Sequence, residues 1–223
     1  MMNNTDKIKI FLVYFILMAG GLWHILGYFK YIMQIAAGPL LMFFALWMVY
    51  EHLAGTSSPR WRWSVLIWSI VVILSSFVIE VIGVKTGSIF GHYAYGNTLI
   101  PTISGVPLAI GFAWLLVAYA STAIVQRLQS IRPLKAAGMV LLIALLMTLF
   151  DFFMEPAAIR LGYWTWEKGH VPVQNYLAWF ILGFVLSLLG YIMNIFRKQI
   201  PIIAVHIYFA QIIYFVMVYF KTD

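Results

Sequence analysis

The segment LKAAGMVLLIALLMTLFDFFM, residues 134–154, decides the structural class of this protein. It is apolar except for Lys135, Thr148 and Asp151. A helix of about 20 apolar residues is long enough to cross the hydrocarbon core of a bilayer. The chain continues as EPAAIRLGYWTW to residue 166, so two acids, Asp151 and Glu155, lie at the end of an apolar run. The segment therefore predicts a transmembrane helix that carries acids near one membrane surface.

The composition extends this prediction to the whole chain. Of 223 residues, 64% are hydrophobic and only 9% are charged, and the mean hydropathy is +0.94. These values are typical of an all-α polytopic membrane protein. The connections are short, so residues 1–223 are interpreted as a single helical domain. Seven segments are long enough to span a bilayer, namely 8–27, 32–52, 63–84, 105–126, 134–154, 176–196 and 200–220.

Several classes of site and partner are disfavoured by the same composition. The chain has no cysteine, which excludes a disulfide framework and a cysteine-based metal site. The first span lacks a small-residue cleavage site and is interpreted as a retained helix rather than a signal peptide. The net charge of +7 is interpreted as a bias of the loops of a membrane protein, and not as a surface for nucleic acid.

The basic residues of the loops predict the topology. With seven spans, the side that holds the N-terminus carries nine of them: Lys7, Lys9, Arg60, Arg62, Arg127, Arg132, Lys135, Arg197 and Lys198. The other side carries five: Lys30, Lys85, Arg160, Lys168 and Lys221. We therefore expect an integral, multi-pass protein of the cell membrane with a cytoplasmic N-terminus.

Polar residues gather at one level of the predicted bundle. Asp151 and Glu155 are four residues apart and share a helix face, and Pro156 is expected to end that helix. Intramembrane ionisable residues are costly and usually face a bundle interior or a wet cavity. We expect one cavity in the outer half of the bundle, lined by Glu80, Asp151, Glu155, His24 and Asn175.

Other interpretations of these residues stay open. Glu155 could pair with Arg160, and Glu80 with Lys85. The aromatic loops could form interfacial belts, although the glycines among them favour tight turns and close approach. A metal site from His24, His92 and the acids has no supporting sequence motif. Two further polar residues, His206 and Gln211, are interpreted as core residues, with the pocket wall as the alternative.

A retinal-binding role is disfavoured, because the last predicted span contains no lysine to form a Schiff base and Lys221 lies at its end.

Three blocks of sequence carry a family resemblance. They are EVIGVKTGSIFGHYAYG (80–96), SGVPLAIGFAW (104–114) and DFFMEPAAIRLGYWTWEKGHVPVQNYLAW (151–179). In order and spacing they resemble the carotenoid biosynthesis membrane-protein family, of the carotenoid hydratase type (bisanhydrobacterioruberin hydratase and carotenoid 1',2'-hydratase). The resemblance runs from about residue 80 to residue 179, with matching apolar spans on either side.

The resemblance implies an enzyme that adds water across the terminal isopropylidene double bond of an acyclic carotenoid and leaves a tertiary alcohol. This hydro-lyase chemistry needs no cofactor, because no oxidation occurs. The implied partners are the carotenoid, water and membrane lipid, and other carotenoid-pathway enzymes are candidates.

The chemistry explains why acids are placed there. Protonating an isolated alkene requires an acid that is still protonated, and a low-dielectric wall favours the neutral form of a carboxyl group. We expect Asp151 to be the proton donor, Glu80 the facing carboxylate and Glu155 the group that manages water. Aromatic faces can stabilise the cation. The expected cavity wall is Tyr93, Tyr95, Trp164, Trp166 and Trp179, and the expected water-orienting groups are His92 and Asn175.

Two other classes of function remain as alternatives. A non-catalytic carotenoid or lipid binder would need the aromatic cleft but not several acids at one depth. A proton-coupled transporter would need polar residues along a route to both sides, and Glu51, His52 and His206 are candidates in the inner half.

Overall fold

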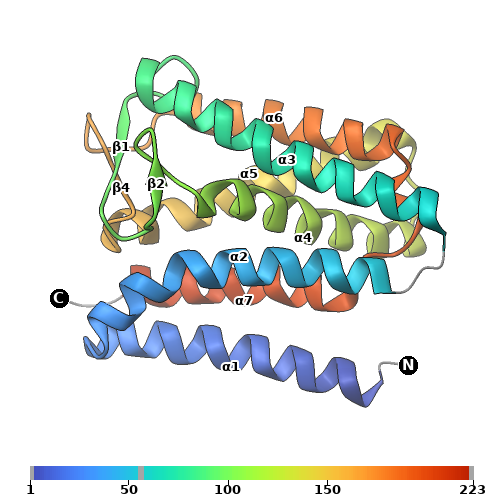
Figure 1. Cartoon of the computed structure of the whole chain (residues 1–223), viewed down its shortest axis with the longest axis horizontal. Helices are drawn as coiled ribbons and strands as arrows, with labels where there is room; N and C mark the ends of the chain where they lie inside the picture. Colours follow the sequence, from blue (N-terminus) through green and yellow to red (C-terminus); the bar gives the residue numbers. More distant parts are fainter. Residues whose placement is uncertain (1–2, 55–57, 221–223) are drawn as a thin grey trace.

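Seven long helices run alongside one another in the computed structural model, which describes residues 3–54 and 58–220 (Figure 1). Each of the seven is long and apolar enough to span a membrane. They are α1 (Asn4–Leu26), α2 (Lys30–Ala54), α3 (Pro59–Thr86), α4 (Ala109–Ile131), α5 (Ala136–Arg160), α6 (Val173–Ile192) and α7 (Ile202–Tyr219). The prediction of an all-α, seven-span membrane protein is confirmed. Lys221 lies outside the described residues.

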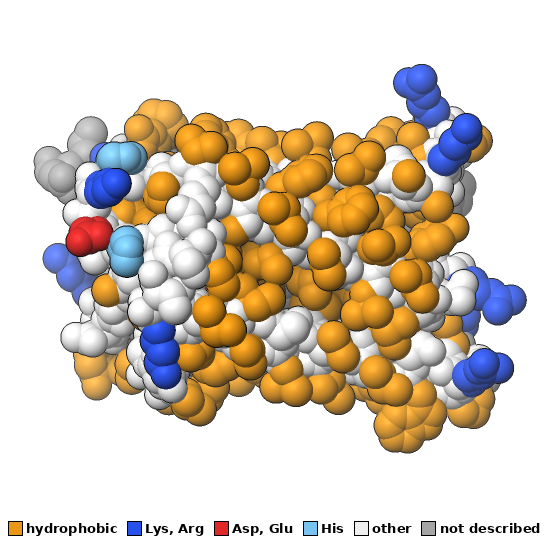
Figure 2. Space-filling view, turned by 90° about the horizontal axis from the view of Figure 1, so that it is seen from above, with side chains coloured by type: hydrophobic (Ala, Val, Ile, Leu, Met, Phe, Trp, Pro, Cys, Tyr) orange, Lys and Arg blue, Asp and Glu red, His pale blue; other side chains and the backbone are white. Residues whose placement is uncertain are grey.

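The surface of the molecule agrees with a membrane location. Apolar side chains cover the middle of the face shown in Figure 2, whereas Lys and Arg side chains gather at its two ends. The start of α1 and the end of α7 lie at opposite ends of the bundle (Figure 1), as an odd number of spans requires.

Helix α4 is the central helix, because every residue from 114 to 123 is buried. A helix that is apolar on all faces is usually a buried one, and the stretch 114–123 is apolar or aromatic except for Ser121 and Thr122. Small residues on α4 also let its neighbours approach closely. At Gly111, an added Cβ atom would lie only 2.6 Å from the backbone oxygen of Ile73 on α3. The backbones of α3 and α4 therefore approach so closely at Gly111 that there is no room for a side chain.

Four short strands lie at one end of the bundle (Figure 1). They are β1 (Tyr93–Tyr95), β2 (Thr102–Ile103), β3 (Val106–Pro107) and β4 (Trp164–Trp166). β1 pairs with β4 antiparallel, and β2 pairs with β3. The second pair occupies part of the predicted 105–126 span, which explains why α4 begins only at Ala109.

The predicted end of the fifth helix at Pro156 is wrong. Helix α5 includes Pro156 and continues to Arg160. A proline inside a helix removes one hydrogen bond and can kink the helix without ending it. Gly162, two residues beyond that end, closes the helix with a φ of +69°, and the backbone N–H of Tyr163 donates to the carbonyl of Ala158 at 3.0 Å. This is the Schellman arrangement, in which a left-handed glycine closes a helix.

The sixth span also ends earlier than predicted. Helix α6 ends at Ile192, and a 3-10 turn, η1 (Ile195–Arg197), follows Asn194, whose φ is +58°. Asparagine tolerates this left-handed conformation better than most residues.

The close approach of α3 and α4 makes a testable prediction. Gly111→Ala should lower the free energy of unfolding by about 1–3 kcal/mol, because the new methyl group meets a backbone atom that cannot move alone. Gly138→Ala on α5 is the matched control, since the nearest atom to its added Cβ is 4.0 Å away. That control should be neutral or stabilising by up to about 1 kcal/mol. Thermal unfolding in detergent measures both, and equal stability of the two variants would contradict the packing described here.

Candidate active site

A cavity of about 520 Å³ lies inside the bundle, and all seven helices and the β1 and β4 strands contribute to its wall. Most of the lining is apolar or aromatic. Glu80 on α3 and Asp151 and Glu155 on α5 all line this one cavity. Their exposed fractions are 5%, 0% and 2%. Three carboxyl groups from two helices therefore share one cavity.

Glu80 accepts hydrogen bonds on both of its oxygens. Tyr93 and Tyr95 donate their hydroxyls to Oε2, the latter at 2.9 Å, and the indole N–H of Trp114 donates to Oε1 at 2.9 Å. Burial, followed by the charge of Glu80, raises the pKa of the Tyr93 and Tyr95 hydroxyls, so both remain protonated donors. An ionised carboxylate only accepts hydrogen bonds, and three donors fill most of its lone-pair positions.

Glu155 is held by a different pair of donors. The indole N–H groups of Trp164 and Trp166 both donate to its Oε2 at 2.9 Å. The two tryptophans lie on β4, only nine and eleven residues further along the chain. The turn at Gly162 makes this return possible, because it reverses the chain directly after α5.

The β1–β4 ribbon explains how these aromatic donors reach the acids. Tyr93 is paired with Trp166, and Tyr95 with Trp164. Side chains alternate between the two faces of a strand, so these four lie on one face, while the exposed Ala94 and Thr165 lie on the other. The ribbon thus presents two phenols and two indoles to the carboxylates.

A glycine permits the end of the ribbon to close. An added Cβ atom at Gly96 would lie 2.1 Å from the carbonyl oxygen of Gly162, and the backbone N–H of Gly96 donates to the carbonyl of Tyr163 at 2.8 Å. Only glycine allows so close a backbone approach.

Asp151 has the fewest hydrogen bonds of the three acids. The side-chain amide of Asn175, from the first turn of α6, donates to its Oδ2 at 2.6 Å. Its Oδ1 is buried and has no hydrogen-bond partner within residues 3–54 and 58–220. Asp151 also lies within electrostatic range of both Glu155 and Glu80. One oxygen of this carboxyl group is therefore left for a proton or a ligand.

Aromatic rings form the wall around the acids. Trp114 and Trp179 stack with their ring centroids 3.8 Å apart and an interplanar angle of 14°. Tyr93 lies 5.0 Å from Trp166, and Tyr95 lies 5.8 Å from Trp164. All six of these side chains line the cavity.

The two predicted histidines lie away from the cavity wall. His92 is exposed, and its ring fills the space beside Gly87, where an added Cβ atom would lie 2.3 Å from it. His24 packs edge-on against Tyr214 at 5.9 Å. Neither histidine is among the cavity-lining residues. In the described part of the chain, no group of three or more His, Asp or Glu side chains is arranged to hold a metal ion.

Several cavity residues with polar or aromatic side chains were not among the predicted site residues. Trp114 and Tyr163 line the wall, as do Gln211 and Tyr214 on α7. Trp114 ends one of the three sequence blocks that carry the family resemblance, which is the one signal that marked it. Gln211 is marked in the sequence only as a polar residue in an apolar helix, and the structure places it in the cavity wall, the alternative to a core position.

Comparison with known proteins identifies the family. The sequence profile of the carotenoid biosynthesis proteins matches residues 13–222. The chain belongs to the carotenoid biosynthesis protein family. The resemblance carried by the three sequence blocks is thereby confirmed.

One curated relative in this comparison is a bisanhydrobacterioruberin hydratase from Haloarcula japonica. It is 30% identical over 124 residues, which make up 54% of this chain and 42% of the relative. The chain thus matches less than half of that relative's length. No solved structure matches the chain. Membership of this family associates the chain with carotenoid biosynthesis.

The hydrogen bond between Asn175 and Asp151 makes a second prediction. Asn175→Leu keeps the branched shape of the side chain but leaves a buried carboxyl group without a donor, so the free energy of unfolding should fall by about 1–3 kcal/mol. Val173→Leu, at a residue of the same helix turn that is 72% exposed, is the control and should change it by less than about 0.5 kcal/mol. Thermal unfolding in detergent measures both. An unchanged Asn175→Leu protein would show that the amide contributes nothing to holding Asp151.

Proposed function

We propose that this protein is a carotenoid hydratase that adds water across the terminal isopropylidene double bond of an acyclic carotenoid and yields a tertiary alcohol. The observation that carries the proposal is the convergence of Glu80, Asp151 and Glu155 on one apolar, aromatic-walled cavity. A binding protein would need the wall but not three buried acids, each of which is costly in a membrane protein.

The numbers of hydrogen-bond donors distinguish the roles of the acids. Among the residues that the structure describes, Glu80 receives three donors, Glu155 two and Asp151 one. Because each donor favours the carboxylate, the group with the fewest donors holds a proton most readily. We therefore assign Asp151 as the general acid, Glu80 as the permanent anion and Glu155 as the base that receives the proton of water.

The proposed reaction balances without a cofactor. The proton on Asp151 forms a C–H bond with the less substituted alkene carbon, and the tertiary carbon becomes a cation. The oxygen of water then bonds to that carbon, and one of its protons passes to Glu155. Returning this proton to Asp151, one helical turn away on the same face, restores the enzyme, and only water is consumed.

The aromatic wall and Glu80 would stabilise the cation. Ring faces attract cations, by about 2 kcal/mol or more when both are desolvated. The stacked Trp114–Trp179 pair and the ribbon aromatics line the same space as the acids. A fixed anion and fixed rings need no reorganisation during the reaction, which makes such electrostatic stabilisation effective.

The substrate is proposed to enter from the lipid, between α1 and α2. On these helices the cavity is lined by side chains that are also exposed on the surface, including Ile16, Trp23 and Phe43. A polyene can leave its tail in the bilayer while its end group reaches the acids. This arrangement supports a membrane-dissolved substrate over a soluble one.

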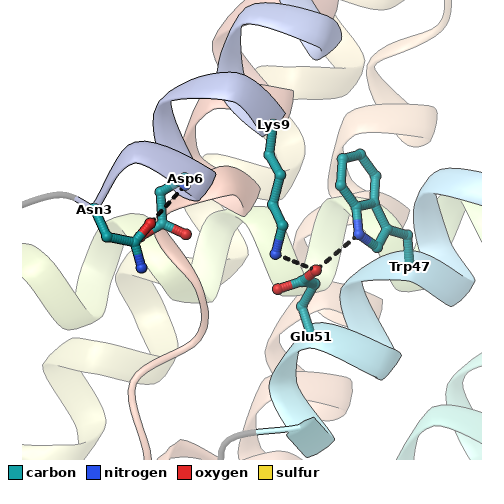
Figure 3. Close-up of polar contacts among 5 residues, drawn as sticks. All are labelled: Asn3, Asp6, Lys9, Trp47 and Glu51. Atoms are coloured by element: carbon teal, nitrogen blue, oxygen red, sulfur yellow. Dashed lines mark hydrogen bonds and ion pairs between the residues drawn. The ribbon is translucent and has the colours of Figure 1, made fainter.

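Contacts at the inner end disfavour a transporter. Glu51 accepts hydrogen bonds from Lys9 at 2.5 Å and from Trp47 at 3.0 Å, which joins α1 to α2 (Figure 3). His52 contacts Tyr119 at 3.4 Å, and His206 contacts Tyr14 at 3.4 Å. None of these three candidate relay residues lines the cavity, so a polar route through the membrane has no support.

We also propose that the N-terminus is cytoplasmic and that the acids lie towards the outer surface of the cell membrane. This orientation rests on the nine basic residues at the N-terminal side against five on the other, because basic loops remain inside.

The proposal is tested by expressing the chain in a lycopene-producing host and measuring the molecular masses of the pigments by mass spectrometry. A gain in mass of one or two waters is the expected result. Unchanged lycopene beside a membrane-inserted protein would reject the hydratase.

The assignment of Asp151 makes the third prediction. Asp151→Asn keeps the shape of the side chain but cannot supply the proton, so hydration should fall by about 100- to 10,000-fold. Glu155→Gln should lose less, and Glu167→Gln, at an exposed acid of the outer loop, should behave as the wild type. Near-normal hydration by Asp151→Asn, with Glu80→Gln or Glu155→Gln inactive, would overturn the roles even if the reaction is right.

Entry between α1 and α2 makes the fourth prediction. Ala36 lines the cavity and is exposed on α2, so Ala36→Trp should obstruct the entrance and lower hydration by about tenfold, which corresponds to about 1.4 kcal/mol. Ile35→Trp is the control, because Ile35 is 42% exposed and does not line the cavity. Equal rates for the two variants in vesicles loaded with lycopene would argue against this entrance.

A further inference from the structure

Gln211 is a buried polar side chain that the proposed chemistry has not yet used. It lies on α7, is 4% exposed and lines the same cavity as the acids. Its Oε1 is buried and has no hydrogen-bond partner in the described part of the chain. Leaving such a group unpaired costs about 1–3 kcal/mol, so its position requires an explanation.

The packing of α7 against α5 places Gln211 close to the level of Asp151. Tyr208, Gln211 and Phe215 are spaced to lie on one helix face. The rings of Tyr208 and Phe215 both pack against Phe150, at 5.2 and 5.9 Å. Gln211 lies between them along α7, and Asp151 directly follows Phe150. Gln211 and Asp151 thus line one cavity from facing helices, and each has one buried oxygen without a partner among the described residues.

An amide oxygen suits one task in this setting. It accepts a hydrogen bond from water but carries no ionisable proton, so it can orient water without competing for the proton of the general acid. A carboxylate at the same position would add another buried charge to three existing acids.

We propose that Gln211 is the water-binding residue of the site and that its Oε1 accepts a hydrogen bond from the water that captures the cation. This inference rests on the proposed hydratase function and adds a role that the three acids do not fill. Water held by Gln211 directs a lone pair of its oxygen towards the tertiary carbon.

The role of Gln211 concerns the fate of the cation and not its formation. Once formed, the cation either bonds to water or loses a proton from an adjacent carbon to the carboxylate of Asp151. The second route regenerates an alkene and the protonated acid, so it also balances. Without oriented water, the second route gains over the first.

Heavy water separates these two routes. In D₂O the general acid delivers a deuteron, so each cation that returns to an alkene can retain deuterium without being hydrated. The measured quantity is the ratio of deuterated, unhydrated polyene to hydrated product, determined by mass spectrometry on vesicles that contain the full chain and lycopene.

Gln211→Met has a similar volume and no amide oxygen. It should raise this ratio by about tenfold or more, which corresponds to about 1.4 kcal/mol lost from the capture step, while KM for the polyene stays unchanged. Gln211→Asn withdraws the amide by one methylene group and should give an intermediate ratio, which keeps the test available if Gln211→Met fails to insert. Gln129→Met is the matched control, because Gln129 also has a buried, unpartnered Oε1 but lines a separate pocket, and it should match the wild type.

Two results would overturn the inference. Hydration and deuterium uptake that fall together in the Gln211 variants, with the ratio unchanged, would indicate a structural role. Normal hydration by Gln211→Met would remove the role altogether. A wild-type protein that neither hydrates lycopene nor introduces deuterium would instead reject the hydratase proposal itself.

Discussion

The cost of burying three carboxyl groups in an apolar bundle is the constraint on which the other features of this structure depend. Such groups persist only when donors satisfy them. Here most of the donors are the N–H and O–H groups of Trp and Tyr side chains, and not lysine or arginine. Aromatic donors satisfy an acid without neutralising it and add apolar surface to the same wall. The acids are therefore stabilised without losing their charge to a basic partner, and the β1–β4 ribbon supplies four of the donors.

Much of the fold could be predicted from the sequence, because the length of an apolar run sets a transmembrane helix almost unaided. The predicted helix ends were wrong where two local signals for ending a helix occur close together in the sequence. Pro156 was expected to end α5, yet packing keeps the helix intact to Arg160 and Gly162 ends it. A proline constrains the residues beside it, but a glycine at positive φ can reverse the chain. The two sequence signals are six residues apart, and only the structure decides which of them acts.

The candidate site was predictable in its acids and less so in their surroundings. Glu80, Asp151 and Glu155 stood out because charge is rare in apolar spans. The partners of these acids depend on long-range pairing, as between Tyr93 and Trp166, which a single sequence does not reveal. Trp114 belongs to an apolar helix in which nothing local marks a donor, and His92 is polar but exposed. A prediction from polarity alone therefore includes histidines that lie outside the cavity wall and misses an indole that donates to an acid.

The alternation of side chains in the β1–β4 ribbon limits how this part of the chain can vary in length. Removing or adding one residue inside either strand would exchange an inward aromatic for an outward Ala94 or Thr165, and the acids would lose their donors while the backbone pairing survived. Changes in steps of two would keep each ring on its side. Related chains should therefore differ in length in the loop between β1 and β2 or between β4 and α6. Within β1 and β4, insertions or deletions of a single residue should be absent.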